Sequence, residues 1–188
     1  MENHMGESVF LDELVKGPVD DLTFHRASVA GAEHKIVVDV FITELLPLAT
    51  LLTPNIPEAE ILANRKIENV EDIKAAAAAI SKLGCRYVLI KGGHFDGEEK
   101  IDYLFEGGKQ KTSYRGISVN TRNTHGTGCT LSSAITSYLA REMDMNTAIA
   151  MAKTYLSGAI LAGKDIKIGE GHGPVNHFYE PKSLFTKS

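Results

Sequence analysis

The residues with the clearest chemical potential form the glycine turn at 123–129, which reads "NTHGTGC" and stands directly before a helix-patterned run. Gly126 and Gly128 allow the backbone to turn tightly and to approach a ligand closely. A helix that begins after them presents unpaired N–H groups and the positive end of its dipole. We therefore expect an anion site at this turn. The alternative is an N-capped helix after a flexible loop, because an isolated G-x-G sequence is a weak signal.

A lysine follows the strongest apolar run of the chain. Lys91 ends the stretch "YVLIK" and stands directly before Gly92 and Gly93. Open α/β sheets bind ligands outside the carboxyl ends of their strands, where this side chain would lie. Lys91 is therefore a candidate ligand-binding residue. The alternative is a solvated lysine at a strand end.

A third group of polar residues lies in "TPNIPEAE", after another short apolar run. Asn55 and Glu58 are three residues apart, and Pro57 suits the first turn of a helix. Their oxygens are of the kind that binds a hydrated magnesium ion through water. The alternative is that Asn55 caps the helix while Glu58 complements its dipole.

The elements that must position these residues follow an α/β pattern. From Lys35 onward, apolar runs of strand length alternate with helical patterns, which is typical of a largely parallel sheet. We expect short strands in "KIVVDV", "LLTPN" and "RYVLIKGG", the last being the clearest buried strand. The segments "IDYLFEGG" and "KTSYRGISVN" predict a hairpin around Gly107 and Gly108.

Three helices are also expected. The first covers about residues 70–83, is rich in alanine and is followed by Gly84 at the position of a left-handed cap. The second carries one apolar face between Leu131 and Leu139, and the third repeats this pattern over residues 147–162. The glycine-rich tail "GEGHGPVNHF" predicts a shaped loop. Pattern alone assigns no role to the first 34 residues.

Composition and charge argue against several classes of function. The 188 residues are 43% hydrophobic, and we expect a single domain. A net charge of −4 with scattered lysines argues against nucleic-acid binding. No apolar run approaches the length of about 18 residues that spans a bilayer, so we expect no membrane partner. Cys85 and Cys129 lie far apart, which supports neither a disulfide framework nor a zinc cluster and favours a reducing, cytoplasmic compartment.

Four ordered segments resemble a known enzyme family: "LLPLATLLTPNIPEAEIL", "YVLIKGGH", "NTHGTGCTLSSAI" and "GPVNHF". Together they resemble the hydroxymethylpyrimidine/phosphomethylpyrimidine kinases of thiamine biosynthesis, members of the ribokinase-like superfamily. The resemblance covers residues 35–178. A cysteine at the glycine turn separates this group from sugar kinases, which carry an aspartate there. The resemblance implies a ribokinase-like three-layer α/β sandwich with a mainly parallel sheet.

The resemblance also implies roles for the glycine turn. Its N–H groups at residues 126–129 would form an anion hole for the γ-phosphate of ATP. Cys129 would accept the proton of the substrate hydroxymethyl group, and a helix N-terminus lowers the pKa of a thiol toward the range where this is possible. The catalytic candidates are Cys129, Gly126 and Gly128.

ATP and Mg²⁺ are the cofactors that the resemblance implies, with a small-molecule pyrimidine as substrate and a homodimer as the assembly. Asn55 and Glu58 would hold the magnesium ion. The loop from Gly173 to His177 would line the nucleotide site. The candidate ATP-binding residues are Lys91, Thr124, Thr127, Gly173 and Val175.

The N-terminal region departs from the family pattern. Nothing there resembles the G-S-D-x-x-G-G-A-G loop that helps to build the pyrimidine pocket, and the motif V-V-D-P-V-M is broken, since "VVDV" runs directly into "FITELLPLA". Three explanations are open: joined pieces of a longer chain, a truncated protein completed by a partner, or a replacement of the lost part. We favour the first and predict a break near Val40 and Phe41.

Two alternatives to the pyrimidine kinase stay open. Pyridoxal kinases of the same family share the "THGTGC" turn, and the pocket residues that would distinguish them are missing. A truncated, non-catalytic nucleotide-binding protein is the alternative outside enzymes. The residues before Thr53 separate the two classes, because they would have to supply the substrate pocket.

Overall fold

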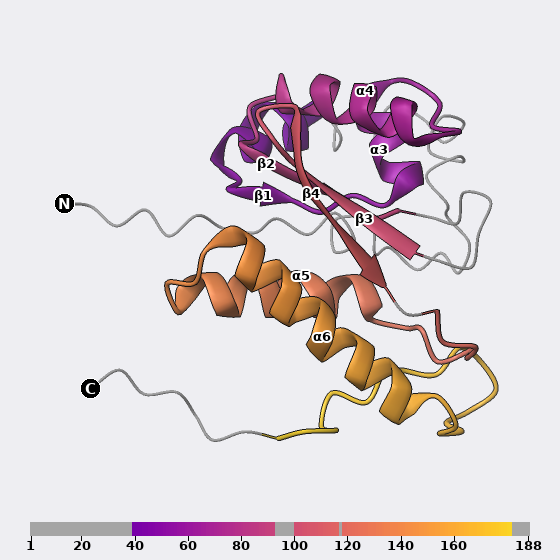
Figure 1. The fold of residues 1–188 in the computed structure, drawn as a ribbon. Coiled ribbons are helices and arrows are strands. Elements are labelled where there is room, and N and C mark those ends of the chain that lie inside the picture. The colour runs from indigo at the N-terminus through magenta and orange to yellow at the C-terminus, as the bar shows by residue number, and fades with distance from the viewer. Residues whose placement is uncertain (1–38, 93–99, 117, 182–188) are drawn as a thin grey trace. The chain divides into compact units, whose positions relative to one another are not determined.

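The computed structural model describes residues 39–92, 100–116 and 118–181. The chain divides into two compact units, Met1–Gly116 and Ile117–Ser188 (Figure 1). The first carries a sheet with helices, and the second carries two long helices and the C-terminal tail. The single domain expected from the sequence stays a prediction. Expectations for residues 1–38 lie outside the described residues.

The sheet of the first unit contains β1 (Leu51–Leu52), β2 (Tyr87–Ile90), β3 (Lys100–Glu106) and β4 (Lys109–Gly116), in that order. Strands β1 and β2 are parallel, whereas the pairs β2–β3 and β3–β4 are antiparallel. The described strands therefore form a mixed sheet, where the sequence predicted a mainly parallel one. The reason is connection length, because a parallel pair needs a crossover of a dozen or so residues, and the chain after β2 is shorter than that.

The predicted hairpin is confirmed. Strands β3 and β4 are joined by Gly107 and Gly108, whose φ angles are 55° and 79°. Two consecutive positive φ values define the two-residue turn that matches the twist of a hairpin, and glycine adopts them without strain.

Two helices accompany this sheet in the first unit, α3 (Ile56–Ala63) and α4 (Val70–Ser81). Helix α4 begins at Asn69, whose side chain accepts a hydrogen bond from the Asp72 N–H, and it buries an apolar face against the sheet. Gly84 follows with a φ of 113°, as expected of a glycine beyond a helix end. The predicted helix is confirmed but ends at Ser81 with Lys82 as its C-cap, so Gly84 has the expected positive φ two residues beyond the cap.

The segment before β1 differs from the prediction. Asp39 and Val40 are helical and lead into a π-helix, Phe41–Leu45, and a 3₁₀-helix, Leu46–Leu48, so the strand expected at 36–40 is wrong at its last two residues. The Leu46 N–H donates to the Phe41 carbonyl, and this five-residue repeat buries both side chains. The helical backbone is continuous through Val40 and Phe41, near which a break was predicted, and the joining of pieces of a longer chain stays a prediction.

The second unit is built on α5 (Thr127–Ala140) and α6 (Met145–Gly163), which pack against each other (Figure 1). Both confirm the predicted helices, and each buries part of the apolar face read from the sequence. Asp144 caps α6 by accepting hydrogen bonds from the N–H groups of Asn146 and Thr147 at 3.0 and 3.1 Å. None of the described helices is long and apolar enough to cross a bilayer.

Candidate active site

Two of the predicted binding residues lie side by side at the carboxyl ends of β1 and β2. Asn55 and Lys91 form an isolated parallel β-bridge, and the Lys91 N–H donates to the Pro54 carbonyl at 2.8 Å. The residues come from segments far apart in the sequence, and the parallel pairing of the two strands brings them together. This edge is the position at which open α/β sheets bind ligands.

Asn55 and Glu58 form a complete capping box at the start of α3. The Asn55 Oδ1 accepts from the Glu58 N–H at 2.9 Å, and the Glu58 Oε2 accepts from the Asn55 N–H at 2.7 Å. A third hydrogen bond of 2.9 Å joins the Asn55 Nδ2 to the Glu58 Oε1. The capping alternative read from the sequence is therefore present in the structure.

Whether this pair suits magnesium depends on the oxygens that the box leaves available. Glu58 is 7% exposed, and both of its carboxylate oxygens already accept from Asn55. Because both oxygens are already engaged, this pair fits a hydrogen bond to a metal-bound water better than direct coordination. Among the described residues no group of three or more His, Cys, Asp or Glu side chains forms a metal cluster.

A buried aspartate that the sequence analysis did not single out supports the segment after Lys91. The Asp102 Oδ1 accepts a hydrogen bond of 3.0 Å from the Gly92 N–H, and Asp102 is buried in strand β3. A Cβ at Gly92 would lie 1.6 Å from the Ile101 carbonyl oxygen, so only glycine fits there. The sequence feature that could have revealed this role is the single aspartate within the apolar run "IDYLF".

The glycine turn opens α5 without a side-chain cap. Gly126 occupies the N-cap position with a φ of 84°, and no side chain accepts a hydrogen bond from the first turn there. The Gly126 carbonyl accepts from the Thr130 N–H at 2.9 Å, which is the first hydrogen bond of the helix. Cys129 lies in this first turn and is partly exposed. The backbone thus has the form expected of an anion site.

The tail predicted to line the nucleotide site lies against this turn. His125 and Pro174 form a parallel β-bridge, in which the His125 N–H donates to the Gly173 carbonyl at 3.1 Å and the Val175 N–H donates to the His125 carbonyl at 3.4 Å. Thr124 directly precedes this bridge. The structure therefore brings together predicted residues that are about fifty positions apart in the chain.

Asn123 holds the start of the turn and was not singled out from the sequence. Its Nδ2 donates to the carbonyls of Gly163 and Ile166 at 2.7 and 2.6 Å, and the residue is 8% exposed. A Cβ at Gly173 would lie 2.2 Å from the Asn123 Oδ1. The position of Asn123 at the head of the "NTHGTGC" segment was the one signal for this role.

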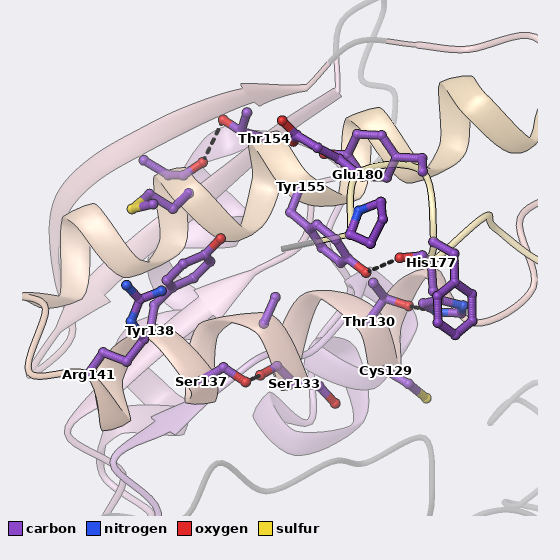
Figure 2. A pocket seen from close by; sticks show the side chains of 16 residues that line it. Cys129, Thr130, Ser133, Ser137, Tyr138, Arg141, Thr154, Tyr155, His177 and Glu180 are labelled. Carbon is purple, nitrogen blue, oxygen red and sulfur yellow. Dashed lines mark hydrogen bonds between the residues drawn. The ribbon is translucent and has the colours of Figure 1, made fainter. Parts of the chain in front are cut away.

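A groove of about 890 Å³ extends along α5 from Cys129 (Figure 2). Cys129, Thr130 and His177 lie at one end of it and Arg141 at the other. The Thr130 Oγ1 and the His177 Nε2 share a hydrogen bond of 2.8 Å, and the Tyr155 hydroxyl donates to the His177 carbonyl at 2.9 Å. The tail is thereby tied to both helices of the unit.

The second cysteine has a different environment. Cys85 is 2% exposed, and its thiol donates to the Tyr87 carbonyl at 3.0 Å. Burial raises the pKa of this thiol to about 11. A thiol that stays protonated is a poor nucleophile and a poor base, so Cys85 has a structural role.

Comparison with known proteins identifies the family. The model of the family described as phosphomethylpyrimidine kinase matches residues 25–176. This match begins ten residues before the resemblance that the motifs indicated, which starts at Lys35. The thiamine biosynthesis bifunctional protein ThiED of Geobacter sulfurreducens is 46% identical over 142 residues, covering 74% of this chain and 28% of that protein. The hydroxymethylpyrimidine/phosphomethylpyrimidine kinase of Escherichia coli is 39% identical over 95% of this chain and 64% of its own length.

A solved structure shows the same fold. The ADP complex of Bacillus subtilis pyridoxal kinase matches with a TM-score of 0.69 and 33% identity, covering 79% of this chain and 56% of that one. The predicted ribokinase-like α/β fold is confirmed by this likeness. This chain spans only 28% to 64% of the two curated relatives and about half of the solved structure. Since the family model matches well over half of its residues, the chain belongs to the phosphomethylpyrimidine kinase family.

Proposed function

We propose that the chain transfers the γ-phosphoryl group of ATP to hydroxymethylpyrimidine and to its monophosphate, as a step of thiamine biosynthesis. The observation that carries the proposal is the N-terminus of α5. It is uncapped by side chains, opens on a glycine with positive φ and holds a partly exposed cysteine in its first turn. Membership of the phosphomethylpyrimidine kinase family supports this assignment.

The γ-phosphate binds the N–H groups at the start of α5. Phosphoryl transfer spreads negative charge over the equatorial oxygens, so positioned donors lower the barrier. Gly126, Thr127, Gly128 and Cys129 supply these donors, and the Thr127 N–H exchanges its bond of 3.3 Å to the Thr124 carbonyl for the phosphate. Glycine at 126 and 128 removes the side chains that would otherwise stand between the backbone and the phosphate.

Cys129 takes the proton of the acceptor hydroxymethyl group. The hydroxymethyl oxygen forms a bond to the γ-phosphorus as the bond from that phosphorus to the ADP oxygen breaks. The proton passes to the Cys129 thiolate, and ADP leaves. A base in contact with the acceptor hydroxyl makes the oxygen a better nucleophile in this step.

The remaining candidates hold the nucleotide and its metal ion. Lys91 neutralises phosphate charge, while Thr124, Gly173 and Val175 line the nucleotide site. Mg²⁺ supplies further charge neutralisation on the phosphates when bound. Asn55 and Glu58 orient water molecules of its hydration shell, because magnesium usually keeps several of its waters and side-chain oxygens can accept hydrogen bonds from them.

Pyridoxal is the second candidate acceptor, since the pyridoxal kinase of Bacillus subtilis is a structural neighbour. A non-catalytic nucleotide-binding role is the third possibility, because the chain spans only part of its relatives. The homodimer and the cytoplasmic location belong to the proposal as well, and size-exclusion chromatography with light scattering tests the first of them.

One assay separates these functions. The purified chain is incubated with ATP, Mg²⁺ and, in turn, hydroxymethylpyrimidine, its monophosphate or pyridoxal, and ADP release is coupled to NADH oxidation. We expect ADP release with both pyrimidines and little with pyridoxal. Release with pyridoxal alone would favour the second function. ATP binding without ADP release from any acceptor would favour the non-catalytic role.

A further inference from the structure

Thr130 connects the glycine turn to the C-terminal tail. Its N–H donates to the Gly126 carbonyl at 2.9 Å, and its hydroxyl shares a hydrogen bond of 2.8 Å with the His177 ring. Thr130 is 7% exposed and directly follows Cys129 in the chain. A shift of the His177 ring would therefore act on the first turn of α5 through a single buried side chain.

The His177 backbone is itself held on α6. The Tyr155 hydroxyl donates to the His177 carbonyl at 2.9 Å, and the neighbouring Asn176 N–H donates to the Ala159 carbonyl at 3.0 Å. Two residues further on, Tyr179 lies so close to Gly158 that a Cβ there would be 2.4 Å from the ring. These contacts fix the tail, so the imidazole has a defined place from which to hold Thr130.

The first turn of α5 needs such support more than the first turns of α3, α4 and α6 do. Helix termini fray, and the side-chain caps that oppose fraying at α3, α4 and α6 are absent from α5. The Thr130–His177 hydrogen bond acts on the same turn from outside the helix and engages none of the leading N–H groups, of which that of Thr127 donates to the Thr124 carbonyl at 3.3 Å.

We propose that His177 is a positioning residue that fixes Cys129 and the first turn of α5 through Thr130. The inference rests on the proposed function, since it assigns Cys129 the role of proton acceptor. His177 does not contact the reacting atoms in this account. Its contribution is to hold the thiol where a displacement of an ångström would slow transfer.

The first test separates turnover from nucleotide binding. In His177→Ala and in Thr130→Val we expect kcat to fall about tenfold while the KM for ATP changes less than about twofold. Thr130→Ser keeps the hydroxyl and should retain most of the parent kcat. Phe178→Ala is the matched control, because this neighbouring side chain is 84% exposed. A rise in the KM for ATP with unchanged kcat would instead make His177 a nucleotide-binding residue and would overturn the proposal.

The double variant tests whether the two residues act through one contact. If they do, Thr130→Val combined with His177→Ala should lower kcat no further than the worse single variant. Multiplied losses, about a hundredfold if each single variant loses tenfold, would mean independent roles and would contradict the proposal.

A second measurement does not depend on kinase activity. Hydrogen exchange of the backbone amide at position 130, which donates to the Gly126 carbonyl, is followed by NMR, with amides of the β3–β4 ladder as the internal reference for global unfolding. We expect both single variants and the double variant to exchange this amide faster by a similar factor, about threefold or more, because the turn opens more often. If no acceptor is phosphorylated but these rates rise, the proposed function fails and the positioning role stands. If transfer occurs and these rates equal those of the parent and of Phe178→Ala, the positioning role is wrong.

Discussion

Helices α3 and α5 meet the same physical demand in opposite ways. Each begins with N–H groups that have no partner within the helix. At α3, the side chains of Asn55 and Glu58 close a reciprocal capping box on these groups. At α5, Gly126 begins the helix in the left-handed region and no side chain caps it. One N-terminus is thus closed by side chains, whereas the other has no side-chain cap, which is what the proposed anion site requires.

The other described α-helices make the contrast sharper. Helix α4 is capped by Asn69 and helix α6 by Asp144, so among the α-helices described only α5 lacks a side-chain cap. The absence of a side-chain cap lowers the stability of a helix by about 1 kcal/mol. Natural proteins tolerate such a loss mainly at functional sites.

The largest effect is expected from Cys129→Ser. A serine hydroxyl is a much weaker base than a thiolate, so turnover should fall about 10²- to 10⁴-fold while ATP still binds. Steady-state rates give the first quantity and an ATP titration by calorimetry gives the second. Turnover equal to that of the parent would remove Cys129 from the mechanism.

Gly126→Ala should lower the free energy of unfolding by about 1–2 kcal/mol, because a side chain at a φ of 84° strains the backbone. The same variant should weaken ATP binding, since the turn shifts to relieve the strain. Gly171→Ala is the matched control from the tail, with nothing within 4 Å of the added Cβ. Urea unfolding of both variants makes the comparison, and equal stabilities would show that the turn needs no glycine at 126.

At α3 both members of the capping box affect stability, and only one of them should also affect metal use. Asn55→Ala should cost about 1 kcal/mol of unfolding free energy, because the Glu58 N–H loses its acceptor. Glu58→Gln turns one of two buried acceptors into a donor that faces an Asn55 donor, so it should cost about 1–3 kcal/mol. If Glu58 also orients magnesium-bound water, this variant should need more Mg²⁺ for half-maximal activity. An unchanged Mg²⁺ titration would restrict the pair to capping.

The smallest effect is expected at the hairpin, far from both helix ends in sequence. Lys111, Arg86 and Tyr87 hydrogen-bond Glu106 and lower the pKa of its carboxyl from 4.5 to about 2. A lowered folded-state pKa means that this contribution is present above pH 4.5 and is lost as the pH falls toward 2. Glu106 carries an exposed network, so the effect is small. Between pH 6 and pH 2.5, the melting temperature should fall slightly less steeply with decreasing pH for Glu106→Gln than for the parent. Identical slopes would show that Glu106 does not contribute.

Much of the fold could be predicted because local signals agree with the tertiary structure. Strand β2 is a contiguous apolar run, and the paired glycines at 107 and 108 permit one kind of hairpin turn. The strand expected at 36–40 was wrong at Asp39 and Val40, which are helical and lead into the π-helix at 41–45. A short apolar run cannot be told from a buried helical segment by its pattern alone.

The candidate site was predictable in its backbone and not in its supports. Glycine and cysteine ahead of an apolar helical face indicate an anion-binding turn from local sequence alone. The bonds from Asn123 to Gly163 and Ile166, and from Thr130 to His177, join residues at least forty positions apart. No local pattern encodes such partners, because they meet only once the helices and the tail have packed.

The most direct test of the central claim follows the backbone amides of α5 by NMR. Spectra of ¹⁵N-labelled protein with saturating Mg²⁺ are compared between ADP and a non-hydrolysable ATP analogue, so that the difference reports the γ-phosphate. We expect the largest differences at Gly126, Thr127, Gly128 and Cys129, and small ones in the first turn of α3, where the capping box occupies the donors. Equal shifts of the α5 amides with both nucleotides would contradict the claim that this uncapped helix end holds the transferring phosphate.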